Sequence, residues 1–111
     1  MRFEVKLTEG NFGKEGRNSH IYIRDLLAHL PKDIIGGSTS RLPAPSMMTL
    51  EYDGCRCQTD IPTDKRTGEA RPFFRTRSFI ASFFNHTKAK PGDIVVFELL
   101  SPYHLRMSLK R

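Results

Sequence analysis

The stretch KAKPGDIVVF, residues 88–97, decides much of the fold because it joins a helix to a core strand. Its Pro91-Gly92 pair predicts a turn, since Pro presets one backbone angle and Gly tolerates positive φ. The run that follows, residues 93–100, is apolar enough to form a buried strand. Before the turn, we expect Ser78 to cap a helix with apolar residues along one side. Those apolar residues are Phe79, Ile80, Phe83 and Phe84.

Outward from this stretch, short alternating segments predict a mainly β domain with seven strands. The predicted strands are residues 2–8, 20–24, 47–52, 55–61, 73–77, 93–100 and 103–109. Asp53-Gly54, between two of them, is a strong hairpin signal. A second short helix should be capped by Asp25, carry three leucines and end before Pro31. Many short strands at close spacing indicate a barrel or sandwich, and the length fits one domain, residues 1–111.

The composition favours a polyanionic partner. The chain has 18 Lys and Arg against 12 Asp and Glu, a net charge of +6. Nucleic acid is the commonest partner of such a basic domain. No apolar run is long enough to span a membrane, so we expect a cytoplasmic protein without membrane contact. Cys55 and Cys57 are too few for a zinc site or a disulfide framework, and we expect two small buried residues, with no metal and no cofactor.

The first candidate binding segment is the loop of residues 9–19 with its continuation to residue 24. Its glycines allow the backbone to approach a phosphate closely, and Asn and Arg can read adenine and guanine edges. The candidate contact residues are Asn11, Lys14, Arg17, Asn18, Ser19, His20, Tyr22 and Arg24. The alternative is an ordinary solvated loop.

The second candidate segment is residues 58–77, in which five cations stand among few carboxylates. A hairpin of this length can project roughly 15 Å, farther than the depth of the major groove, about 8.5 Å. Asp60 or Asp64 could accept a hydrogen bond from a cytosine amino group. The alternative is a charged surface hairpin. The candidate residues are Gln58, Asp60, Thr63, Asp64, Lys65, Arg66, Arg71, Arg75 and Arg77.

An enzyme alternative comes from His86, Lys88 and Asp93, which spell HxKxxxxD. This is the signature of the phospholipase D superfamily, in which His attacks phosphorus and a second His protonates the leaving group. Here Asp93 opens a core strand, and the turn before it has a structural explanation. We therefore expect the chain itself to be non-catalytic. A minimal phosphodiesterase dimer using His86 remains an alternative.

Three segments together resemble the B3 DNA-binding pseudobarrel of plant transcription factors and of some bacterial restriction endonucleases. They are the opening strand with residues 12–24, the aromatic helix of residues 78–85, and KAKPGDIVVF. The resemblance implies an open seven-stranded pseudobarrel with two short helices and no cofactor. It also implies that two arms enter the major groove of double-stranded DNA at a short specific site. The first arm would be residues 11–24 and the second arm residues 60–71.

The second arm is rich in Asp, Lys and Arg, whereas the plant arm is aromatic and rich in Asn or Ser, and the chain has no Trp. In this respect the chain looks more like the restriction-enzyme branch, which implies a bacterial recognition domain that works beside a separate nuclease domain. A binding module of the OB type, for single strands or RNA, is the other alternative. That alternative requires exposed aromatic side chains on which bases can stack.

Overall fold

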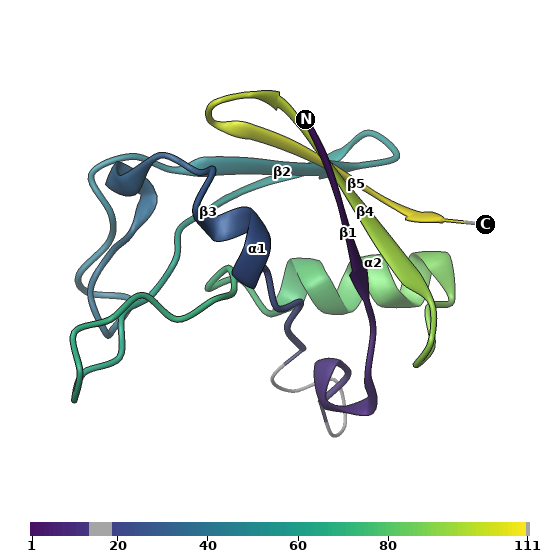
Figure 1. The fold of residues 1–111 in the computed structure, drawn as a ribbon, viewed down its shortest axis with the longest axis horizontal. Coiled ribbons are helices and arrows are strands. Elements are labelled where there is room, and N and C mark those ends of the chain that lie inside the picture. Colours follow the sequence, from purple (N-terminus) through teal and green to yellow (C-terminus); the bar gives the residue numbers. More distant parts are fainter. Residues whose placement is uncertain (14–18, 111) are drawn as a thin grey trace.

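The computed structural model describes residues 1–13 and 19–110, and over these the protein is mainly β (Figure 1). Five strands form a single open sheet. They are β1 (Arg2–Lys6), β2 (Met48–Tyr52), β3 (Cys55–Thr59), β4 (Ile94–Ser101) and β5 (His104–Lys110). Two α-helices, α1 (Arg24–Leu27) and α2 (Ser78–Thr87), and two 3-10 turns, Glu9–Asn11 and Lys32–Ile34, complete the fold.

The sheet has the order β1-β4-β5-β2-β3, with every pair antiparallel except β2 with β5. In β4, Val95 pairs with Val5 and Leu109 on its two sides. Paired residues share a face, because side chains alternate along each strand. The apolar residues of five strands therefore gather on one inner face, which forms the core.

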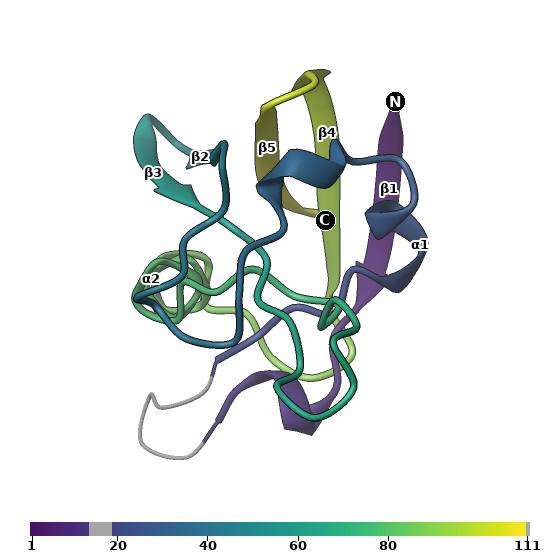
Figure 2. The same ribbon diagram turned by 90° about the vertical axis from the view of Figure 1, so that its left-hand side faces the viewer.

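Helix α2 packs against this inner face. Its Ile80, Phe83 and Phe84 are buried, and the Phe83 ring meets the ring of Tyr52 edge-on at 5.3 Å. Burying each such side chain contributes about 1.5–3 kcal/mol. Figure 2 shows α2 nearly end-on below β2 and β3, with α1 beside β1. In both views, most of the longer connections lie below the sheet, on the side of α2.

The outer face of the sheet is polar and carries cross-strand ion pairs. Arg106 lies 3.4 Å from Glu98, and Lys110 lies 3.2 Å from Glu4. His104 contacts Glu51, which also pairs with Arg56 at 3.3 Å. Positive charge on this face is thus largely balanced by neighbouring carboxylates.

The prediction of seven strands is wrong at two segments of the described chain. Residues 20–24 alternate correctly, with Ile21 and Ile23 buried, but the Ile23 N–H donates to the Pro72 carbonyl in a loop. Residues 73–77 likewise pair with a loop, since the Arg75 N–H donates to the Asp60 carbonyl. Both segments are irregular chain. In residues 20–24 the alternation reflects burial of Ile21 and Ile23, and in residues 73–77 only Phe73 and Phe74 are buried.

Three local predictions also need correction. Ser78 is the first residue of α2 rather than its cap, and Asp25 lies inside α1, so neither helix has the expected side-chain cap. Cys55 is exposed rather than buried, although both cysteines are free. Cys57 is half-buried, and burial raises the pKa of its thiol to about 11. Among the described residues, no helix has the length and apolar character needed to cross a bilayer.

Candidate nucleic-acid interface

Two adjoining hollows form one groove on the loop side of the molecule. The first, about 500 Å³, is lined by residues from three loops: His20, Ser38, Thr39, Ser40, Pro62, Arg71, Phe73, Arg75 and Arg77. The second, about 420 Å³, runs on to Gln58 and Asp60 at the end of β3. Ser40, Arg75 and Arg77 line both, so the two hollows are neighbours. We call the two hollows together the basic groove.

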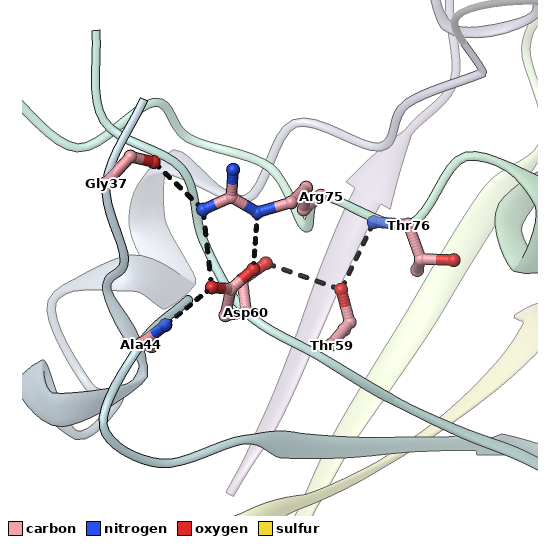
Figure 3. Close-up of polar contacts among 6 residues, drawn as sticks. All are labelled: Gly37, Ala44, Thr59, Asp60, Arg75 and Thr76. Carbon is pink, nitrogen blue, oxygen red and sulfur yellow. Dashed lines mark hydrogen bonds and ion pairs between the residues drawn. The ribbon is translucent and has the colours of Figure 1, made fainter. Parts of the chain in front are cut away.

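The floor of the basic groove is a buried ion pair (Figure 3). Asp60 is only 3% exposed, and its carboxylate accepts hydrogen bonds from Arg75 Nε at 2.7 Å and Arg75 Nη2 at 3.3 Å. The carboxylate also accepts from the Ala44 N–H at 2.9 Å, while Arg75 donates to the Gly37 carbonyl at 2.9 Å. Charge-assisted bonds of this kind are the stronger hydrogen bonds in proteins. The pair fastens the loop of residues 36–45 to the second arm.

Gly36 leaves the space that this ion pair occupies. A Cβ added there would lie 2.5 Å from Asp60 Oδ2 and 2.8 Å from the Ala44 nitrogen. Such distances are far inside van der Waals contact. The sequence therefore needs glycine at position 36 for Asp60 to reach its partners.

Stacked side chains join the two arms above this floor. The His20 ring stacks on Phe73 with centroids 4.1 Å apart, and the Arg71 guanidinium lies 4.9 Å from the Phe73 centroid. Tyr22 meets the edge of Phe73 at 6.2 Å, and Arg24 in turn lies 5.0 Å from the Tyr22 centroid. Each cation–ring contact contributes about 0.5–1 kcal/mol at exposed sites. A chain of ring contacts through Phe73 thus links Arg24 of the first arm to Arg71 of the second arm.

His20 is held in an electropositive setting. Its backbone carbonyl accepts a hydrogen bond from Asn11 Nδ2 at 2.9 Å, which fixes the chain at this point. Burial lowers the pKa of His20, and the charges of Arg77 and then Arg71 lower it further. Its Nδ1 atom is buried and has no hydrogen-bond partner among the described residues.

The second arm ends in a small hairpin that points away from the sheet (Figure 1). Thr63 and Ala70 form an antiparallel bridge at its base. Asp64 Oδ1 accepts from the backbone N–H groups of Arg66 and Thr67, at 2.8 and 3.2 Å, and stabilises the turn. Lys65 and Arg66 are exposed at the tip, which confirms that the excursion has little to bury.

Four predicted contact residues serve the scaffold instead. Asn11 is buried, and its Oδ1 accepts from the Thr8 N–H at 2.7 Å. Ser19 is buried and donates to the Phe12 carbonyl at 3.3 Å. Asp60 is taken up by the ion pair with Arg75, and Asp64 stabilises its own turn. Short polar residues in loops often satisfy local backbone groups, and the sequence alone did not separate the two uses.

The remaining predicted residues divide by exposure. Those exposed are Arg24, Gln58, Lys65, Arg66, Arg71 and Arg77. Those partly exposed are His20, Tyr22, Thr63 and Arg75. Lys14, Arg17 and Asn18 lie outside the described residues. The basic groove brings together residues of both candidate segments, chiefly His20, Arg71, Arg75 and Arg77.

Sequence reasoning missed the loop of residues 38–40. Ser38, Thr39 and Ser40 were not among the predicted contact residues, yet all three line the basic groove. Hydroxyl side chains are common phosphate ligands. The run of three hydroxyl residues before Arg41 was the available signal.

The residues of the HxKxxxxD spelling lie around the end of α2. His86 Nε2 lies 2.7 Å from Asp53 Oδ2 in the β2–β3 turn, while Asp93 Oδ2 accepts from the Lys90 N–H at 3.0 Å. Lys88 ends the helix with a left-handed backbone, φ 55°. The structure thus joins His86 to Asp53 rather than to Asp93. No cluster of three potential metal ligands occurs among the residues that the structure describes.

The likeness to the B3 pseudobarrel rests on the three segments quoted from the sequence. The five-stranded sheet with two helices is compatible with it at the level of fold class. Comparison of the chain with protein-family models and with curated protein sequences gives no match.

Proposed function

We propose that this chain binds double-stranded DNA through the basic groove and the two arms beside it. The observation that carries the proposal is the charge of the groove. Arg71, Arg75 and Arg77 line it, and the one carboxylate among its described lining residues, Asp60, is neutralised by Arg75. A surface of this kind provides the sequence-independent attraction for phosphates.

The second arm supports recognition of a duplex in particular. Lys65 and Arg66 project at the tip of a narrow hairpin, and a two-stranded ribbon fits the major groove. Arg24 and Arg71, held by the stacked rings, would flank that entry. Phosphate contacts in the basic groove would fix the register, and side chains of the arms would read bases. The finer fold assignment that goes with this function is a B3-like pseudobarrel.

The contacts of the aromatic residues favour a duplex over a single strand. Phe73, the ring of the basic groove, is buried between His20 and Arg71. The exposed Tyr103 donates a hydrogen bond to Asp33 and does not line the basic groove. Stacking platforms for single strands need open ring faces along one path. From the resemblance to the B3 domains of restriction endonucleases, we also propose that the chain works beside a nuclease domain in a bacterial cytoplasm.

Salt dependence tests the proposed function. If the arms and the groove neutralise about five phosphates, log affinity should fall with log salt at a slope of roughly −4 to −5. Arg71→Ala and Arg77→Ala should each weaken binding and reduce that slope by about 1. Arg106→Ala is the matched control, because it removes one positive charge from the outer face of the sheet.

Fluorescence anisotropy with a labelled duplex and its separate single strands measures both effects. Tighter binding of the duplex than of either strand is expected. A flat salt dependence would contradict duplex binding. An equal loss of DNA affinity in Arg106→Ala and Arg71→Ala would contradict binding through the basic groove. Preference for the single strand would favour the OB-type alternative.

The enzyme alternative has its own test. We expect the purified chain to leave DNA uncut, with or without divalent metal ions, and His86→Ala to leave binding unchanged. His86 contacts Asp53 and Tyr52 and is not one of the residues that line the basic groove. Gel analysis of a supercoiled plasmid provides the measurement. Metal-independent cleavage that disappears in His86→Ala would establish the phosphodiesterase instead.

A further inference from the structure

The first hollow of the basic groove concentrates groups that bind phosphate. His20, Arg71 and Arg77 line it together with the hydroxyl residues Ser38, Thr39 and Ser40. Among the described residues, the other charged groups that line the basic groove are Arg75 and Asp60, which are bonded to each other. Arg71 therefore adds positive charge to the described lining beyond that pair. Three loops supply these residues, so the arrangement exists only in the folded chain.

We propose that this hollow binds one phosphate group of the DNA backbone and that His20 takes up a proton when the phosphate enters. The inference rests on the proposed function, because DNA supplies the phosphate. It adds a specific ligand group, a third contacting loop at residues 38–40, and a dependence of binding on pH.

The surroundings of His20 account for the proton uptake. In the free protein, partial burial and the charges of Arg77 and Arg71 oppose the imidazolium form. A phosphate in the hollow brings negative charge beside the same arginines and reverses their combined effect. The protonated ring also has two N–H donors, whereas the neutral ring has one. Nδ1, which has no partner in the described structure, would then be able to donate after a small ring movement.

The direction of the pH effect follows by linkage. Because the bound state favours protonated His20, affinity for DNA should increase as the pH falls through the pKa of His20 in the complex, over a range from about 8 to about 5. We expect the gain to be about tenfold, a size typical of one nearby opposite charge. Below the pKa of His20 in the free protein, both states are protonated and the gain stops increasing.

The decisive experiment follows the four imidazoles by NMR in the wild-type protein across this pH range. It is carried out on the free protein, with inorganic phosphate, and with a short duplex of mixed sequence. Phosphate contacts carry no base specificity, so an arbitrary duplex is a valid probe at low salt. We expect both additions to raise the pKa of His20, whereas the imidazole signals of His86, which does not line the hollow, should not respond.

His20→Asn provides a second measurement, with His86→Asn as its control. Asn keeps a neutral polar side chain, and the backbone bonds of position 20 to Asn11 do not involve the replaced ring. His20→Asn should lose the increase of DNA affinity at lower pH, whatever its affinity at about pH 8. His86→Asn should keep that increase.

The possible outcomes separate this inference from the proposed function. If Arg71→Ala weakens DNA binding while DNA leaves the pKa of His20 unchanged, the inference is wrong and the proposed function stands. If inorganic phosphate raises the pKa of His20 but the duplex does not bind, the phosphate site stands and DNA is wrong as its source. An unchanged pKa with both ligands overturns the site itself.

Discussion

The buried ion pair of the basic groove gives the sharpest prediction for stability. Asp60→Asn keeps the size of the side chain but removes its charge. The wild-type carboxylate accepts from two nitrogens of Arg75 and from the Ala44 N–H, and an amide has a single oxygen with which to replace it. The amide NH2 must then face a donor. Arg75, with its side chain only 21% exposed, loses its counter-charge.

The magnitude follows from these contacts. Hydrogen bonds to charged groups contribute about 1.5–3 kcal/mol each, and removing one partner of a buried ion pair costs about 3–5 kcal/mol. Because Asn retains one acceptor, we expect the lower end, about 3 kcal/mol of unfolding free energy. At about 4 °C per kcal/mol for a domain of this size, Tm should fall by roughly 12 °C.

Glu98→Gln is the matched control. It also removes one carboxylate charge from an ion pair, but its 3.4 Å contact with Arg106 lies at the surface, with side chains 39% and 47% exposed. Such pairs contribute less than about 1 kcal/mol. Urea unfolding followed by circular dichroism should shift its midpoint strongly for Asp60→Asn only, at an unchanged m value. Equal midpoints for the two variants would refute the structural role assigned to Asp60.

Three further predictions concern other positions. Gly36→Ala should destabilise the protein by about 1–3 kcal/mol in the same assay, because the new methyl group would lie 2.5 Å from Asp60 Oδ2. Gly10→Ala is the control and should be tolerated, because the nearest atom to its methyl group would be 3.8 Å away. Iodoacetamide at about pH 8 should modify exposed Cys55 much faster than Cys57, because burial raises the pKa of the Cys57 thiol to about 11. Mass spectrometry measures the two rates of labelling, and equal rates would contradict this prediction. Lys65→Ala should change stability by no more than about 0.5 kcal/mol while weakening DNA binding, and a large loss of stability would mean that the hairpin tip is packed.

Much of the sheet could be predicted from the sequence because its strands pair mainly with strands. Alternation in residues 2–8 and the apolar run of residues 93–100 correspond to β1 and β4, and Asp53-Gly54 forms the expected turn with φ of 44° and 82°. At residues 20–24 and 73–77 the same signals were misleading. Their apolar side chains, Ile21, Ile23, Phe73 and Phe74, are buried, but their backbones bond to loops, and a one-dimensional pattern reports only burial.

The candidate site was predictable in its charge and not in its architecture. Arg71 and Arg77 follow from the clustering of cations in the second arm. The burial of Asp60 depends on Arg75, 15 residues later in the chain, and on the absence of a side chain at Gly36. Such long-range pairing is not encoded in local composition. The participation of Ser38 likewise depends on how this ion pair positions its loop.

The hairpin at the end of the second arm has a consequence for engineering and for evolutionary change. Its base is closed by the Thr63–Ala70 bridge and by the bond from the Arg71 N–H to the Pro62 carbonyl, at 2.8 Å. Residues beyond this closure make few contacts with the rest of the chain, whereas the buried anchor at Asp60 lies before it. Tips of different sequence or length could therefore be exchanged above Thr63 and Ala70 without refolding the scaffold. One framework could in this way accumulate many binding preferences through changes confined to a handful of consecutive codons.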